Sequence, residues 1–369
     1  VTGLDLVELQ LRIADGEPLP ITQDDVRVDG HAIEVRVVAE DPAAGWLPST
    51  GTLERFEIGE GVRVDTGART GTEVTTDYDS LLAKVIVHAP TRGDAARRLA
   101  RALRSAWIAG VATDVPALVA ILTERDYLAA ETPTSYLDEH PDVATSTGPV
   151  GDDRVALLLG AVFANEYRSR TTDRTTGFAP SGWRNLRTIG QRQTWTDGET
   201  AEHVEYAMHG RDAAEVRIGP WPAPTDDGSL SPEERRVVEV RLFERSGSTQ
   251  IIEVDGVRHR IDVLSSGDTV HVRSAAGSAT WTLEPRFVDH DLVDAGGGPT
   301  SPLPGTVLSV HVAAGDHVED GGVLVIVEAM KMEHKICAVG DVTVAEVLFG
   351  EGDRVDAGDL LVRLETPDE

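Results

Sequence analysis

Residues 323–338 read VLVIVEAMKMEHKICA, and this stretch decides how the end of the chain folds. The apolar run before Met330 and the mixed run after Lys331 each predict a strand, so we expect a hairpin with these two residues at its tip. A lysine in a turn is usually only a solvated residue. Lys331, however, has a methionine on each side, and these are two of the three methionines in the chain. Flexible, apolar methionines suit a surface that another enzyme grips.

An internal repeat with an offset of 37 residues surrounds this hairpin. Residues 306–328 align with residues 343–365, so that the turn glycine Gly315 coincides with Gly352 and the apolar Leu324 with Leu361. Two copies of one strand pattern predict a small, quasi-symmetric β-sandwich with the hairpin at its symmetry point.

A tether is predicted just before the repeat. Residues 294–304 read DAGGGPTSPLP and mix flexible glycines with stiff prolines. A mobile domain that displays one amine is what a swinging acyl carrier needs.

The composition limits the remaining possibilities. The chain has 63 acidic and 34 basic side chains, and this excess argues against nucleic-acid and membrane-surface partners. Its length of 369 residues predicts two or three domains. The single Cys337 cannot form an internal disulfide and no apolar run is long enough to span a membrane, so a cytoplasmic location is expected. Because Val1 lies inside a helical pattern, we expect the chain to be a fragment.

The rest of the sequence predicts an α+β, multidomain chain. Before residue 140, periodicity and turn residues predict helices at 4–13, 94–110 and 115–125 and strands at 31–38, 52–58, 62–65 and 81–88. The polar, Pro- and Gly-containing stretch 137–151 predicts a linker. A helix over 153–168 and many short alternating segments up to residue 284 then predict an antiparallel barrel or sandwich, with the helix packed on or in it.

The hairpin motif resembles that of a known family. Glu328 to Met332 read EAMKM, and 301–307 read SPLPGTV; together they are similar to the biotin carboxyl carrier domain. The resemblance implies that Lys331 carries covalent biotin and that a biotin protein ligase recognises Glu328, Ala329, Met330 and Met332. Lipoyl domains share this fold, but their lysine usually lies beside an acidic residue and lacks the paired methionines.

The first part of the chain resembles the C-terminal subdomain of biotin carboxylases. The similarity rests on GHAIEVR at 30–36, AEDP at 39–42, PSTG at 48–51 and YDSLLAK at 78–84. It implies that Arg36 lies in the bicarbonate and biotin pocket, where a fixed guanidinium can bind a developing oxyanion and orient a carboxylate. The family's ATP-grasp core would precede this chain. ATP and Mg or Mn are therefore expected only in the full-length subunit, and this chain alone is expected to be inactive in biotin carboxylation and to hold no metal.

The middle region resembles the connecting domain of acyl-CoA carboxylase α subunits. That resemblance implies docking of a carboxyltransferase β subunit in a hetero-oligomer, with Trp183, Arg184 and Asn185 as expected contacts. The expected domains are then a truncated biotin carboxylase C-terminal subdomain at 1–140, a helix plus antiparallel β-barrel connecting domain at 150–290, and a β-sandwich (barrel-sandwich hybrid) biotinyl carrier domain at 300–367.

Taken together, the resemblance is to the C-terminal part of the α subunit of a biotin-dependent acyl-CoA carboxylase. It implies ATP- and bicarbonate-dependent carboxylation of biotin on Lys331 and transfer of the carboxyl group to an acyl-CoA on the β subunit. Propionyl-CoA or 3-methylcrotonyl-CoA is the expected acceptor, with a slight preference for the branched one. The alternatives are an acetyl-CoA carboxylase α subunit, a lipoyl carrier of an oxoacid dehydrogenase, and a structural assembly subunit whose lysine is unmodified.

Overall fold

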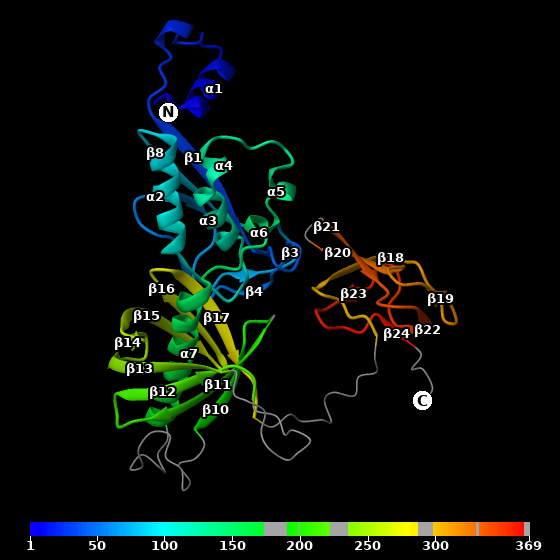
Figure 1. Ribbon diagram of the computed structural model, residues 1–369. Helices are drawn as coiled ribbons and strands as arrows, with labels where there is room; N and C mark the ends of the chain where they lie inside the picture. Colours follow the sequence, from blue (N-terminus) through cyan, green and yellow to red (C-terminus); the bar gives the residue numbers. More distant parts are fainter. Residues whose placement is uncertain (173–189, 199, 222–234, 287–297, 330–331, 365–369) are drawn as a thin grey trace. The chain divides into compact units, whose positions relative to one another are not determined.

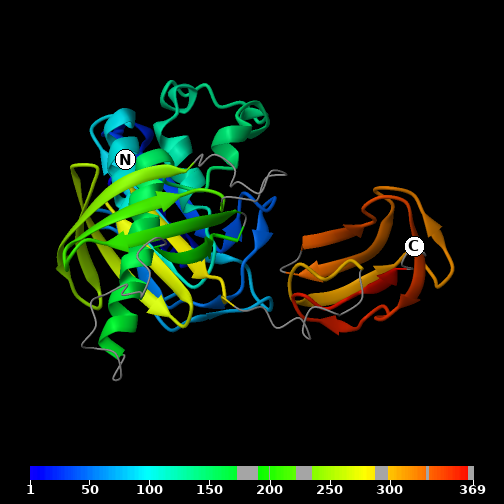
Figure 2. The ribbon, with the colours of Figure 1, turned by 60° about the horizontal axis from the view of Figure 1, so that its bottom comes forward.

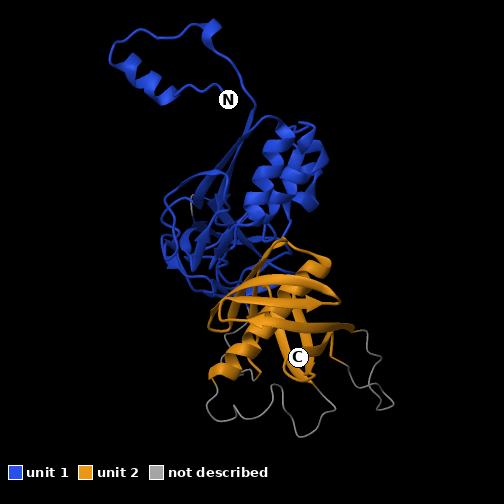
Figure 3. Ribbon diagram, turned by 90° about the vertical axis from the view of Figure 1, so that its left-hand side faces the viewer, with its two compact units in different colours: residues 1–147, 298–369 blue, residues 148–297 orange. Residues whose placement is uncertain are grey.

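The computed structural model describes residues 1–172, 190–198, 200–221, 235–286, 298–329 and 332–364 (Figure 1). Two compact units are distinguished in Figure 3: Val1–Thr147 with Gly298–Glu369, and Gly148–Gly297. Among the helices in these ranges, none has the length and apolar character needed to cross a membrane.

The N-terminal part, residues 1–147, is built on a three-stranded antiparallel sheet with the order β1-β8-β6. These strands are β1 (His31–Val38), β8 (Leu81–Ala89) and β6 (Arg63–Thr66). One face of the sheet carries apolar side chains that pack against the long helix α2 (Arg92–Arg104). Thr91 caps α2, accepting a hydrogen bond from the Asp94 amide at 3.1 Å. The periodicity of α2 therefore places its alanines and leucines on the sheet and leaves most of its arginines exposed, as expected for a solvated stripe.

Short elements complete this part. Helix α1 (Leu6–Ala14) confirms the first predicted helix and is followed by the 3₁₀ turn η1 (Gln23–Asp25). Three two-stranded pairs follow: β2 (Glu40–Asp41) with β3 (Leu47–Pro48), β4 (Gly51–Thr52) with β7 (Glu73–Val74), and β5 (Arg55–Glu57) with β9 (Trp107–Ala109).

The predicted helix at 94–110 is wrong at its end. Helix α2 stops at Arg104, and Trp107–Ala109 form strand β9, which pairs with β5. Gly110 explains why the chain can turn away there. Its φ is +106°, and a Cβ on it would lie 1.9 Å from the Thr52 carbonyl oxygen, so only glycine allows this approach of two backbones.

The predicted linker at 137–151 is also partly wrong. After α3 (Val115–Thr123) and α4 (Arg125–Leu128), two short helices, α5 (Tyr136–Glu139) and α6 (Pro141–Ala144), occupy its first half. Tyr136 and Ala144 are buried, which anchors a stretch whose composition alone suggested an irregular chain.

The barrel unit, residues 148–297, consists of helix α7 (Gly151–Thr172) and a closed antiparallel barrel. The described strands of the barrel are β10 (Gln191–Thr196), β11 (Ala201–Met208), β12 (Ala213–Ile218), β13 (Arg236–Arg245), β14 (Thr249–Val254), β15 (Val257–Ser266), β16 (Thr269–Ser274) and β17 (Gly277–Leu283). Every residue of α7 from Ala156 to Glu166 is buried, so the helix is covered on all sides. Figure 2 shows the strands wrapped around it. Of the two predicted arrangements, the helix lies in the barrel.

Gly160 and Gln250 show how closely the barrel fits this helix. A Cβ on Gly160 would lie 2.9 Å from the Ile261 side chain, and the Gln250 amide donates a hydrogen bond to the Gly160 carbonyl at 3.1 Å. The small residue thus brings β15 close to the helix backbone.

The C-terminal sandwich, residues 298–364, has two sheets with the orders β21-β20-β18-β23 and β19-β22-β24. Its strands are β18 (Gly305–Val310), β19 (His317–Val318), β20 (Val323–Ala329), β21 (Met332–Cys337), β22 (Val342–Val347), β23 (Arg354–Val355) and β24 (Val362–Leu364).

Backbone hydrogen bonds confirm the predicted repeat in the sandwich. The Gly315 amide donates to the Val344 carbonyl and the Gly352 amide donates to the Val307 carbonyl, both at 2.8 Å. Gly315 and Gly352, and likewise Val307 and Val344, are 37 residues apart, so the two bonds are equivalent and the two halves are related by a pseudo-twofold axis.

Candidate functional site

The predicted attachment hairpin is formed by β20 and β21, which pair from Val323 with Cys337 up to Ala329 with Met332. The two remaining residues, Met330 and Lys331, lie outside the described residues. The strands therefore confirm the hairpin, while the modification of Lys331 stays a prediction.

The side chains at the described end of the hairpin differ in exposure. Ala329 is only 4 % exposed, whereas Met332 is 38 % exposed and its neighbour Glu333 is also exposed. Glu333 pairs across the hairpin with the exposed Glu328. An apolar side chain and two carboxylates are thus presented beside positions 330 and 331.

The segment before β18 supports the same hairpin. A Cβ on Gly305 would lie 2.6 Å from the Glu328 carbonyl oxygen, so only glycine lets β18 approach the end of β20 this closely. Leu303 is buried, and the Ser301 hydroxyl donates to its carbonyl at 2.7 Å. The predicted tether at 294–304 is therefore wrong for its described part, because residues 298–304 pack on the sandwich at the base of the hairpin; residues 294–297 lie outside the described residues.

His334 belongs to the buried side of the hairpin. It pairs with the core residue Val327, and its Nε2 is buried with no hydrogen-bond partner among the described residues. Burial lowers the pKa of His334, which favours the neutral imidazole. This histidine contributes packing rather than charge.

Arg36, the predicted carboxylase-pocket residue, is exposed on β1, on the face of the sheet opposite α2. It pairs with Lys84 of β8, and Lys84 pairs in turn with Asp65 of β6, so these three side chains form one row across the sheet. Arg63 donates two hydrogen bonds to Asp65, each at 2.9 Å, and these bonds hold the pKa of Asp65 below its usual value.

A buried carboxylate fixes the end of the same strand. The Asp114 side chain accepts a hydrogen bond from the Val38 amide at 2.9 Å, and the Asp114 amide donates to the Val38 carbonyl at 3.3 Å. Burial raises the pKa of Asp114 to about 7, and the negative charge of Glu40 acts in the same direction, against the opposing effect of the Val38 bond. Sequence reasoning missed this residue, since an isolated aspartate before a helix reads as an ordinary cap.

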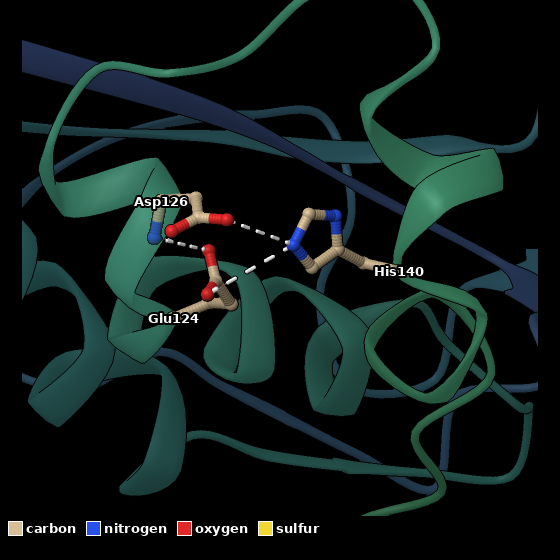
Figure 4. Close-up of side chains that lie close together, drawn as sticks. All are labelled: Glu124, Asp126 and His140. Atoms are coloured by element: carbon tan, nitrogen blue, oxygen red, sulfur yellow. Dashed lines mark hydrogen bonds and ion pairs between the residues drawn. The ribbon is translucent and has the colours of Figure 1, made fainter.

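Glu124, Asp126 and His140 form a second titratable cluster that sequence reasoning missed (Figure 4). The His140 Nε2 lies 3.4 Å from Asp126 and 4.0 Å from Glu124. One oxygen of Glu124 already accepts hydrogen bonds from the amides of Asp126 and Tyr127 and from the Tyr136 hydroxyl, at 2.6, 2.8 and 3.1 Å. Glu124 thus caps α4, and the cluster links that cap to α5 and α6. We interpret it as a structural clamp, because its carboxylates are engaged in these bonds.

The clamp predicts a pH dependence. The bond from His140 Nδ1 to the Tyr136 carbonyl and the two carboxylates raise the pKa of His140, against the opposing effect of burial. A raised pKa means that His140 stabilises the fold fully below its unfolded pKa of about 6.5, and that this contribution disappears as the pH rises through the folded value. We therefore expect hydrogen exchange in residues 135–145 to be slower, after correction for intrinsic rates, at pH 6 than at pH 8.5. His140→Gln should remove this difference; if the variant keeps it, another group is responsible.

Comparison with known proteins identifies the two outer segments. Residues 34–139 match the family "Biotin carboxylase C-terminal domain", and residues 299–364 match the family "Biotin-requiring enzyme". These segments include Arg36 of β1 and the hairpin around Lys331. The two outer parts of the chain are therefore similar to domains of biotin carboxylases and of biotin-requiring enzymes.

Its curated relatives are more specific. The chain is 33% identical to the mitochondrial propionyl-CoA carboxylase alpha chain of Caenorhabditis elegans, over 92% of this chain and 48% of that protein. It is 30% identical to the mitochondrial methylcrotonoyl-CoA carboxylase subunit alpha of Mus musculus, over 99% of this chain and 51% of that protein. The 2-oxoglutarate carboxylase small subunit of Hydrogenobacter thermophilus is 45% identical over 45% of this chain and 36% of its own length. The chain is thus a homologue of acyl-CoA carboxylase α subunits and spans about half the length of those relatives.

Proposed function

We propose that this chain carries biotin on Lys331 as part of an acyl-CoA carboxylase α subunit, with propionyl-CoA or 3-methylcrotonyl-CoA as the acceptor. The observation that carries this proposal is the β20–β21 hairpin, whose last paired residues, Ala329 and Met332, directly flank Met330 and Lys331. The methionine on each side of Lys331 favours biotin over a lipoyl group, because lipoyl domains usually lack this pair.

The residues around the hairpin fit an attached cofactor. Covalent biotin supplies a ureido nitrogen that can carry a carboxyl group. The sandwich supplies a rigid base, because Gly305 allows β18 to pack against the hairpin. The exposed Met332 and Glu328 give a biotin protein ligase both apolar and acidic contacts, and with Ala329 and Met330 they form the proposed recognition sequence.

Intact mass spectrometry tests the proposal directly. After co-expression with a biotin protein ligase in a biotin-replete host, the chain should gain the mass of one biotin, located on the peptide that contains Lys331. A lipoyl adduct at that position would instead support the oxoacid dehydrogenase alternative. An unmodified chain that remains folded would support the structural alternative and overturn the proposal.

We also propose that Arg36 acts in the carboxylation pocket. Its guanidinium is exposed on a regular strand, so it can donate two parallel hydrogen bonds to a planar carboxylate or bicarbonate. The nucleotide and its metal would be bound by the part of the relatives that this chain does not cover.

The test of Arg36 requires an α subunit of the relatives' full length that contains this chain. There, Arg36→Ala should lower bicarbonate-dependent ATP cleavage by at least about 100-fold, because a group that stabilises developing charge is lost. Arg98→Ala, which removes an exposed arginine of α2, serves as the control and should have little effect. Equal activity in the two variants would remove Arg36 from the pocket.

For the middle of the chain, we propose a docking role. The barrel unit corresponds to the expected domain at 150–290 and would bind a carboxyltransferase β subunit, giving a hetero-oligomer. The expected contacts Trp183, Arg184 and Asn185 lie outside the described residues. The proposed domain division places the carboxylase subdomain at 1–140 and the carrier domain at 300–367, on either side of this unit.

The cellular location is a separate proposal. A single cysteine and a strong acidic excess are compatible with a reducing compartment, and we propose the cytoplasm. The propionyl-CoA and methylcrotonoyl-CoA carboxylase relatives described above are named as mitochondrial.

A further inference from the structure

The row of side chains that contains Arg36 places two cations directly opposite each other. Arg36 of β1 and Lys84 of β8 are register partners, and both point away from the core that packs on α2. Opposite partners in an antiparallel pair have Cβ atoms about 5 Å apart. Two like charges on directly opposite residues destabilise a sheet. The pairing of Arg36 with Lys84 is therefore not explained by the stability of the strand pair.

The donors of both cations are available. The side chain of Arg36 makes no hydrogen bond or ion pair with any residue in the described ranges. The Lys84 ammonium lies 3.9 Å from Asp65, which is an ion pair but exceeds hydrogen-bonding distance. Asp65 is already bound through both oxygens by Arg63. The guanidinium of Arg36 and the ammonium of Lys84 therefore both present free N–H groups on one face.

The local charge contrasts with that of the whole chain. Glu34, Arg63 and Asp65 also lie on this face, so it carries three cations and two anions within a chain whose net charge is −29. An arginine beside a lysine, both with unused donors, suits a small planar oxyanion: the fork of the guanidinium can bind two oxygens while the ammonium contacts a third.

We propose that Lys84 is an anion-binding residue that, together with Arg36, binds the bicarbonate substrate. This inference rests on the proposed role of Arg36. It goes beyond that role because it assigns a second charged group to the same substrate and explains the unfavourable pairing of two cations. The planar guanidinium of Arg36 orients the bound anion, and the ammonium of Lys84, on a flexible side chain, adjusts its position to the anion.

The proposal is tested by steady-state kinetics of an α subunit of the relatives' full length that contains this chain. In Lys84→Met, which keeps the length of the side chain, the KM for bicarbonate should rise about tenfold, the effect of losing one charge-assisted hydrogen bond. The KM for ATP should change less than about twofold, and Lys84→Arg should recover most of the loss, since it restores a cation. Arg98→Met is the matched control for removing one positive charge at an exposed position.

Each outcome has a separate meaning. If Arg36→Ala lowers the rate but Lys84→Met leaves the KM for bicarbonate unchanged, the role of Lys84 is overturned and that of Arg36 stands. If Lys84→Met raises the KM for ATP instead, the ligand is a phosphate group and the proposal is wrong. If Arg36→Ala has no effect, the proposed pocket itself fails and the inference falls with it. A purely structural role of Lys84 would lower the thermal stability of Lys84→Met without a selective change in the KM for bicarbonate.

Discussion

Replacing Lys331 with arginine should abolish biotin incorporation completely. Arginine keeps the positive charge and a similar length, so the sandwich should fold as before. Its guanidinium stays protonated at any accessible pH, however, and cannot serve as the nucleophile that a ligase acylates, whereas the lysine amine can. Streptavidin capture and intact mass of the chain after co-expression with a biotin protein ligase measure the result.

Lys335→Arg is the matched control for this substitution. Lys335 is an exposed residue of β21, four positions after Lys331 on the same hairpin. The Lys335→Arg variant should incorporate biotin to the same extent as the unmodified chain, because Lys335 lies outside the proposed recognition sequence. Biotin on the Lys331→Arg variant, or its loss from the Lys335→Arg variant, would show that another lysine is the attachment site.

Asp114→Asn should stabilise the N-terminal part of the chain at alkaline pH. Burial raises the pKa of Asp114 to about 7, from an unfolded value of about 3.9. A raised carboxyl pKa means that the native state binds the proton more tightly, so stability is full below about pH 4 and falls as the pH rises to about 7. The full cost of ionising the buried group is at most about 4 kcal/mol. Asparagine avoids that cost and keeps an oxygen for the Val38 amide.

Hydrogen exchange of peptides that cover residues 31–38 measures this effect in the intact chain. The free energy of opening in Asp114→Asn, relative to the unmodified chain, should increase by on the order of 2 kcal/mol between pH 5 and pH 8. Asp114→Ala is the control: it leaves the Val38 amide without this acceptor and should destabilise β1 at both pH values, by about 1–3 kcal/mol. A pH-independent difference between Asp114→Asn and the unmodified chain would mean that Asp114 is ionised in the folded state, as in the unfolded state, over this whole range, so that burial does not raise its pKa.

The parts of the fold that depend on local pattern were predictable. The hairpin follows from the apolar run before Met330 and the mixed run after Lys331. The sandwich follows from the repeat, whose hydrogen bonds at Gly315 and Gly352 match the sequence offset. The helix of the barrel unit was predicted from its apolar residues. The buried residues of this helix lie on all of its sides, and this explains why the barrel encloses it. A prediction of a single buried face does not account for that position.

The errors have long-range causes. Trp107 to Ala109 continue the helical pattern of α2, but pairing with β5, some fifty residues earlier, makes them a strand. The stretch after Leu137 has the composition of a linker, yet its first half is held by the Glu124–Asp126–His140 clamp. That clamp and the contact between Asp114 and Val38 join residues that are distant in sequence, so no spacing rule reveals them.

The residues with proposed functions show the same contrast between local motifs and long-range contacts. Lys331 and Arg36 lie in short motifs and could be singled out from sequence. Lys84 belongs to the YDSLLAK segment, but only the register of β1 against β8 reveals that it lies opposite Arg36. A motif thus gives the identity of a residue, and strand register is needed to know its neighbours.

The helix enclosed by the barrel has a consequence for how the chain acquires its structure during synthesis. Residues 151–172 leave the ribosome before any strand of the barrel, and the ring closes only when the last strand, β17, meets the first, β10. The strands can therefore be laid down one after another around a core that is already in place, and no preformed ring has to be threaded. A circular permutant that moves this helix behind the last strand should fold far more slowly, because the barrel could then close only after the helix had been synthesised and placed inside it.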